Sequence, residues 1–294
     1  DLKKEYFKKG STALRKLGVI DLDCYCCPIC HRLYLPGALD TGELTLEHAP
    51  PERVGGKPLA LTCKECNSVA GYSVDLAVVN RQRQFDFTRA VIGHKTGQNL
   101  SARGTLSIAG EKLNVRFEVN DDAISIIPPR ENNDPQKMKN FKNTMMHLHQ
   151  TDTENGQQFT ITPTIKYFHK HSKVGDLKAA FIICFAFFGY AFALNKRLLP
   201  VRQQIMNYDK TIIKGFWFAS DPNVNQEHFI CLTETPVVAL TVKLDHAIIV
   251  LPWLEGPNDI YGYLGDNYKS NERVDFSGRY FSWPLRLEMR LDYY

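Results

Sequence analysis

The stretch of sequence that decides the fold runs from Cys27 to Asp75. It contains CPIC (27–30), LTLEHAPPERVGG (44–56) and LTCKECNSVAGYSVD (61–75). The two CxxC pairs, Cys27/Cys30 and Cys63/Cys66, are separated by 32 residues. Each pair presents two thiolates from one tight turn, and four thiolates bind zinc tetrahedrally. The spacing therefore predicts one structural Zn²⁺ ion held by all four cysteines.

A second choice of ligands exists at the first pair, because Cys24 and Cys27 are also spaced as CxxC. We prefer Cys27 and Cys30, since Pro28 between them favours a tight turn. Replacement of one ligand by Cys24 or Cys26 stays open at this point.

Between the cysteine pairs the sequence predicts two short strands, followed by a helix. Apolar and polar residues alternate over 44–48, a strand pattern that Pro50 and Pro51 end. Residues 59–61 form the second expected strand, and helical periodicity begins near Asn67. A strand–strand–helix unit with a zinc knuckle at each end needs little hydrophobic core of its own.

Three polar residues of this unit have the chemistry needed to hydrolyse a phosphodiester. His48 is a candidate general base, because the pKa of histidine lies near neutrality. Glu47 and Asn67 supply the oxygen ligands that Mg²⁺ or Mn²⁺ prefers. Taken singly, each has an ordinary structural explanation, and Asn67 in particular could only cap a helix.

Together these residues resemble the HNH, or ββα-metal, endonucleases, in particular the zinc-bearing branch with two CxxC knuckles, such as recombination endonuclease VII-like and bacterial HNH proteins. The resemblance covers residues 24–80 and implies that His48 is the general base and that Glu47 and Asn67 are metal ligands. It makes Asp75 a further candidate ligand. Two features depart from the family pattern: Glu47 replaces the usual aspartate, and Pro58 stands where many members have an asparagine.

Arginine residues follow the predicted helix and suggest a partner. Arg81, Arg83 and Arg89 form a local basic cluster that we expect to contact nucleic-acid phosphates. The net charge of +4 is compatible with such a partner without requiring one. We expect DNA rather than RNA.

The remaining sequence predicts a second, larger domain. We expect an α+β protein in which residues 1–97 form the zinc-stabilised ββα-metal module and residues 98–294 a mixed α+β domain. Its role is open between regulation, oligomerisation and nucleic-acid binding, with a homo-oligomer or a regulatory protein as partner. Residues 179–194 carry no charge but are short for a membrane span, so we predict a buried core helix. Paired cysteines that bind zinc are typical of a reducing compartment, which predicts a cytoplasmic protein without membrane association.

We therefore predict a metal-dependent endonuclease, with a bacterial anti-phage defence effector as one setting suggested by the resemblance. The alternative is a non-catalytic zinc-knuckle module that binds nucleic acid or a protein partner. In that case Glu47 and His48 are structural residues.

Overall fold

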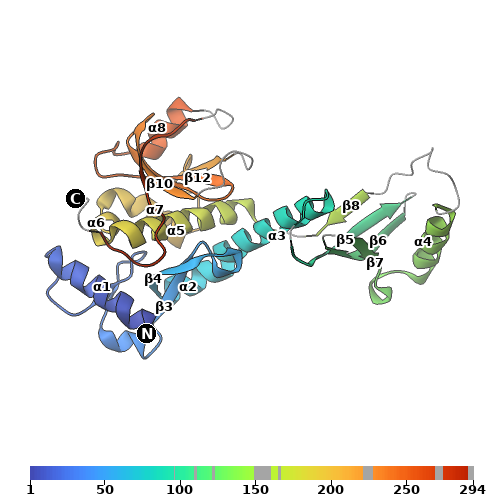
Figure 1. Ribbon diagram of the computed structural model, residues 1–294, viewed down its shortest axis with the longest axis horizontal. Coiled ribbons are helices and arrows are strands. Elements are labelled where there is room, and N and C mark those ends of the chain that lie inside the picture. The colour runs from blue at the N-terminus through green and yellow to red at the C-terminus, as the bar shows by residue number, and fades with distance from the viewer. Residues whose placement is uncertain are drawn as a thin grey trace. The chain divides into compact units, whose positions relative to one another are not determined.

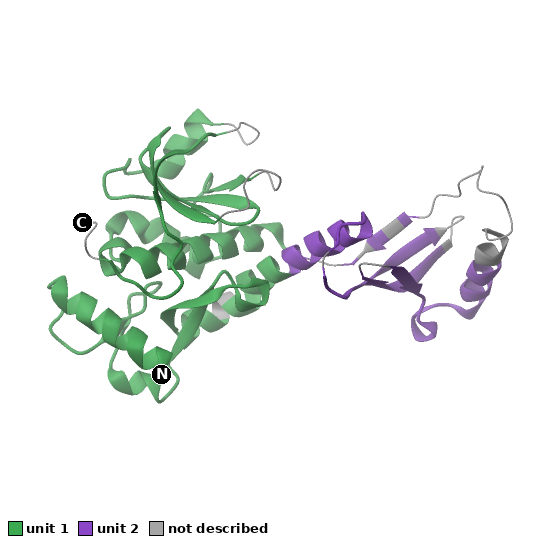
Figure 2. Cartoon of the chain, viewed as in Figure 1, with its two compact units in different colours: residues 1–79, 168–294 green, residues 80–167 purple. Residues whose placement is uncertain are grey.

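We describe a computed structural model of the chain. The structure describes residues 1–95, 97–108, 111–120, 123–148, 160–164, 167–220, 228–268 and 274–290. The chain divides into two compact units, one formed by residues 1–79 and 168–294 and the other by residues 80–167 (Figure 2). The fold is mixed α+β with antiparallel sheets, as the sequence predicts.

The first unit contains the predicted strand–strand–helix segment. β3 (Leu44–Ala49) pairs antiparallel with β4 (Lys57–Cys63), and α2 (Lys64–Ala70) follows β4 directly (Figure 1). The register shifts between Glu47 and His48, so that Glu47 lies opposite Ala60 and His48 opposite Pro58. Such a bulge interrupts the strict alternation of side chains and bends the strand. The extra residue, Leu59, is on β4, so the bulge and its bend lie on β4, opposite the Glu47-His48 dipeptide.

The helical segment after Cys66 has two parts. A π-helical turn, η3 (Gly71–Asp75), separates α2 from α3 (Leu76–Val91). A π-turn inserts an extra residue per turn, which rotates the side chains that follow it relative to a regular helix. The direction of the Asp75 side chain is therefore not the one that a continuous helix from Asn67 would give.

The zinc-knuckle segment lies beside the N-terminal helix. α1 (Leu2–Lys16) contacts β1 (Tyr25–Cys26), which pairs with β2 (Leu33–Tyr34). This N-terminal helix buries one face, with Tyr6, Phe7 and Leu14 in the core.

The apolar segment predicted as a core helix forms part of α5 (His169–Phe188), and all of its residues from Val174 to Phe188 are buried. Among the helices that the structure describes, none combines the length and apolar character needed to cross a membrane. α5 contacts both β3 and β4 and also the π-turn η3. Gly175 permits this approach, because a Cβ there would come within 2.8 Å of the carbonyl oxygen of Val74. α5 thus lies directly against the hairpin that carries Glu47 and His48.

A five-stranded antiparallel sheet, which α5 contacts through β12, completes the first unit. Its strand order is β13-β10-β11-β12-β9, with bounds Ser277–Phe281, Phe229–Thr235, Ala239–Lys243, Ala247–Leu251 and Trp217–Ala219. The helices of this part of the chain are α6 (Tyr190–Ala193), α7 (Leu199–Met206) and α8 (Ile260–Asn267). The inner strand β11 is buried at all five positions.

The second unit has a four-stranded antiparallel sheet in the order β7-β6-β5-β8. Its strands are Ile124–Ile127, Glu111–Val119, Leu100–Ile108 and Thr160–Pro163, and it also includes α4 (Pro135–Leu148). A separate hydrophobic cluster that includes Phe87, Leu113 and Phe117 stabilises this unit.

The division into units differs from the predicted boundary between residues 97 and 98. The first unit ends at Val79, inside α3, and resumes at Phe168. The physical reason is the apolar helix α5, which belongs to the same hydrophobic core as the N-terminal hairpin. Residues 168–294 therefore fold with the zinc-knuckle segment, and only residues 80–167 form a separate unit.

Candidate metal centre and the residues around it

The structure brings together the four cysteines predicted as zinc ligands. Their Sγ atoms all lie within 4.8 Å of one another, and Cys30 Sγ lies 3.7 Å from Cys63 Sγ. A zinc ion with bonds of about 2.3 Å to four thiolates requires sulfur–sulfur distances of about 3.8 Å. The cysteine cluster fits a tetrahedral zinc ion.

Backbone amides orient two of these sulfur atoms. Cys63 ends β4 and caps α2, so that the backbone N–H of Cys66 donates to Cys63 Sγ at 3.4 Å. The N–H of Cys63 donates to Cys27 Sγ, also at 3.4 Å. Hydrogen bonding with Cys27 lowers the pKa of the Cys30 thiol to about 7. The same contact raises the pKa of the Cys27 thiol. The two backbone hydrogen bonds favour the thiolate form that zinc requires.

The neighbouring cysteines lie outside this cluster in the part of the chain that the structure describes. The buried thiol of Cys26 contacts the carbonyl oxygen of Cys27 at 3.8 Å, and burial raises its pKa to about 12. Burial also raises the pKa of Cys24. The geometry selects Cys27 and Cys30, which resolves the choice that the sequence left open.

Two buried tyrosines, which sequence reasoning did not single out, fix the knuckle to the rest of the first unit. The Tyr25 hydroxyl donates to the carbonyl of Leu61 at 3.0 Å and accepts from the Leu61 N–H at 3.2 Å. The Tyr190 hydroxyl makes the same pair of bonds to Cys26, at 2.6 and 3.0 Å. Nothing in the local sequence pattern marks either residue, because both partners are distant along the chain.

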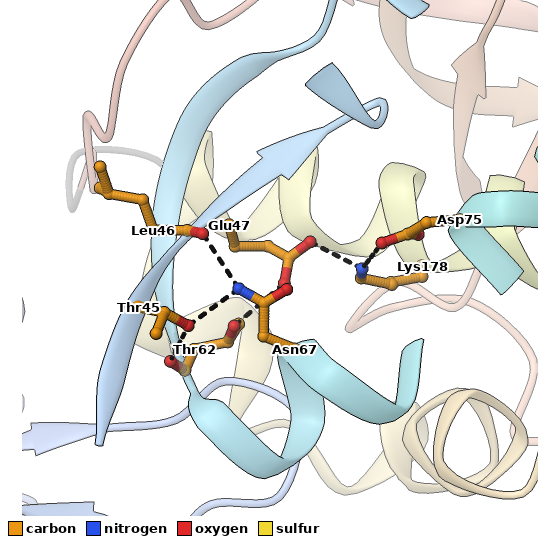
Figure 3. Close-up of polar contacts among 7 residues, drawn as sticks. All are labelled: Thr45, Leu46, Glu47, Thr62, Asn67, Asp75 and Lys178. Atoms are coloured by element: carbon orange, nitrogen blue, oxygen red, sulfur yellow. Dashed lines mark hydrogen bonds and ion pairs between the residues drawn. The ribbon is translucent and has the colours of Figure 1, made fainter. Parts of the chain in front are cut away.

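Glu47, the first predicted ligand of a catalytic cation, is only 2% exposed. Its Oε1 lies 2.7 Å from the ammonium of Lys178 on α5, and its Oε2 accepts a 3.0 Å hydrogen bond from Thr62 (Figure 3). The same ammonium lies 2.7 Å from Asp75 Oδ2. The structure thus gathers Glu47 and Asp75 around one cation, and this cation is Lys178.

Burial and their mutual charges shift the pKa values of Glu47 and Lys178. Burial raises the pKa of Glu47, and the positive charge of Lys178 acts against that shift. Burial lowers the pKa of Lys178, but the two carboxylates outweigh it and the net shift is upward. The lysine is therefore held in its charged form.

Asn67, in α2, forms two hydrogen bonds to β3. Its amide nitrogen donates to Thr45 Oγ1 at 2.8 Å and to the carbonyl of Leu46 at 3.0 Å (Figure 3). Both amide hydrogens are therefore used within the protein. Its oxygen accepts no hydrogen bond from any residue that the structure describes.

His48 follows Glu47 at the bulge and is half-buried. Its ring makes no hydrogen bond or ion pair with any residue in the described ranges of the chain. Among the described residues, then, no protein group occupies the ring nitrogens of His48, and a general base requires such an accessible nitrogen.

The predicted phosphate-binding arginines all lie on α3, beyond the residue at which the first unit ends. Arg83 and Arg89 are exposed, and the Arg89 guanidinium lies 5.8 Å from the centroid of the Phe85 ring. Their contact with nucleic acid stays a prediction.

Comparison with known proteins identifies no relative: no protein-family model, curated protein or solved structure matches this chain. The resemblance to HNH endonucleases therefore rests on the residues described above.

Proposed function

We propose that this protein is a metal-dependent nuclease that hydrolyses phosphodiester bonds in nucleic acid, with DNA as the favoured substrate. One observation carries the proposal. The hairpin of β3 and β4 carries Glu47 and His48, and the next helix, α2, carries Asn67. The four-cysteine cluster includes Cys63 and Cys66, where β4 ends and α2 begins.

His48 is the general base of the proposed reaction. It would take the proton from a water molecule that attacks the phosphorus atom. Its half-exposed position on β3, opposite the bulge of β4, leaves it accessible to solvent and to a substrate. General-base catalysis by a positioned side chain contributes about 10²- to 10⁴-fold to the rate.

Glu47 and Asn67 are the residues that would hold a catalytic Mg²⁺ or Mn²⁺ ion. Such an ion, when bound, offsets the negative charge that develops on the phosphate. Among the residues that the structure describes, each Glu47 oxygen has one polar contact, to Lys178 or to Thr62, and a carboxylate has about four lone-pair positions. The remaining positions, with the amide oxygen of Asn67, offer oxygen ligands of the kind that Mg²⁺ prefers.

A second function is favoured by the burial of Glu47. A carboxylate that is 2% exposed and paired with a lysine can serve structure alone. The protein would then be a non-catalytic zinc module that binds nucleic acid or a protein partner.

A cleavage assay with the zinc-loaded full chain separates the two functions. Supercoiled plasmid DNA and single-stranded RNA are incubated with Mg²⁺ or Mn²⁺, and parallel samples receive EDTA after zinc loading. The nuclease proposal predicts cutting of DNA that depends on the added cation. Binding of DNA without cutting of DNA or RNA under any of these conditions would support the non-catalytic module instead.

A further inference from the structure

Lys178 is a deeply buried charged side chain beside the candidate site, and no sequence motif marks it. It lies on α5 and is 2% exposed. Its ammonium nitrogen lies 2.7 Å from an oxygen of Glu47 and 2.7 Å from an oxygen of Asp75 (Figure 3).

The two carboxylates come from elements that are distant from Lys178 in the sequence. Glu47 lies on β3 and Asp75 ends the π-turn η3. Glu47 is buried and Asp75 is partly buried. Two carboxylates that converge on one point in such a site repel each other unless a cation lies between them. The group contains two acidic residues and one basic residue, so it favours a cation strongly.

We propose that Lys178 is the resident cation of the Glu47–Asp75 pair and excludes divalent metal ions from it. An ammonium and a divalent ion between the same two carboxylates would lie only a few ångströms apart, and their repulsion is strong in a buried site. Within the function proposed above, on which this part of the inference rests, a catalytic ion is confined to the Asn67 side of Glu47. Asp75 is then a partner of Lys178 rather than a metal ligand.

This assignment predicts a gain of metal binding when the ammonium is removed. Lys178→Met keeps a long unbranched side chain but has no charge. Glu47 and Asp75 would then face each other without a cation, and Mn²⁺ would bind between them. The double variant Lys178→Met/Asp75→Asn lacks one of the two ligands and should lose this new site. The triple variant Glu47→Gln/Asp75→Asn/Lys178→Met is neutral and serves as a control for packing.

The experiment counts bound Mn²⁺ by electron paramagnetic resonance during titration of the zinc-loaded full chain. We expect Lys178→Met to bind one more Mn²⁺ than the wild-type protein, or to bind it at least tenfold more tightly. The extra binding should be absent in the double and triple variants. No gain of Mn²⁺ binding in folded Lys178→Met would overturn the proposal, as would wild-type Mn²⁺ binding that weakens on Asp75→Asn.

If Lys178→Met folds poorly, thermal unfolding with and without Mn²⁺ takes the place of the titration. Mn²⁺ should then restore native circular dichroism and raise the melting temperature of Lys178→Met, with no comparable rise for the triple variant. Failure of Mn²⁺ to restore the fold, while the triple variant folds, would contradict the proposal. Both measurements report cation binding without cleavage, so they can succeed or fail independently of the nuclease proposal.

Discussion

The hydroxyl group of Tyr190 holds both backbone groups of Cys26, donating to its carbonyl at 2.6 Å and accepting from its N–H at 3.0 Å. Tyr190 begins α6, which follows the apolar helix α5, whereas Cys26 precedes Cys27, the first cysteine of the cluster. This buried contact joins α6 to the segment that carries the first two cysteines of the cluster.

The first prediction concerns this contact. Tyr190→Phe removes the hydroxyl and leaves two buried backbone groups without their partner, which costs about 1–3 kcal/mol for an unsatisfied buried group. Chemical denaturation should show a lower free energy of unfolding by that amount. The control is Tyr280→Phe, because Tyr280 is 58% exposed and its substitution should have almost no effect. Equal effects of the two substitutions would contradict the role given to Tyr190.

The second prediction concerns the N-terminal segment alone. A fragment of residues 1–97 lacks α5, so Leu59, Leu61 and Glu47, each at most 2% exposed in the full chain, would lose the helix that contacts their hairpin. We expect this fragment to lack a cooperative thermal transition by circular dichroism, even with zinc. A sharp transition and dispersed amide signals would show instead that the module folds without α5.

The third prediction concerns the cysteine cluster. The wild-type chain should contain one zinc ion per molecule by elemental analysis. Cys63→Ser should reduce this content strongly and lower the melting temperature, because a structural zinc site contributes folding free energy directly. Cys24→Ala is the matched control, since Cys24 is buried nearby but lies outside the cluster. Zinc loss in Cys24→Ala with retention in Cys63→Ser would refute the assignment.

The fourth prediction concerns the stability that Lys178 provides. Removal of one partner from a buried ion pair typically costs about 3–5 kcal/mol, so Lys178→Met should be destabilised by about that amount without added metal. The neutral triple variant should lie closer to the wild-type protein. Comparable destabilisation of both variants would show that packing, rather than charge, explains the loss.

The same group predicts a dependence on alkaline pH. The pKa of Lys178 is raised in the folded protein, whereas that of an unfolded lysine is about 10.4. The folded state therefore binds the proton more tightly, and this contribution to stability is complete below about pH 10.4. It is lost as the pH rises through the higher folded value. The difference in unfolding free energy between wild type and the triple variant should decline over that range; a constant difference would argue against the charged lysine.

The sequence predicts the structure best where the structure depends on the spacing of residues that are close along the chain. The CxxC pairs predicted the cysteine cluster, and alternation followed by helical periodicity predicted β3, β4 and the helix after Cys66. The uncharged segment 179–194 predicted buried helix, and α5 confirms that prediction over Ala179–Phe188.

The rest could not be predicted because it depends on contacts between distant residues. Lys178 lies 103 residues from Asp75 along the chain. The sequence around Lys178 has the pattern of a solvent-exposed flank of an apolar helix. The return of the chain to the first unit at Phe168 was missed for the same reason. α5 packs against a surface that exists only once β3 and β4 have paired. The sequence alone therefore does not show which surface α5 covers.

The most direct test of the account is DNA cleavage by His48→Ala. Plasmid nicking by the zinc-loaded full chain in Mn²⁺ is compared with nicking by His48→Ala and by a control, His94→Ala, in which the substituted histidine is exposed. We predict that His48→Ala cuts at least about 100-fold more slowly, as expected for loss of a general base, with unchanged zinc content, and that His94→Ala cuts at the wild-type rate. Equal cutting by His48→Ala and wild type would contradict the account.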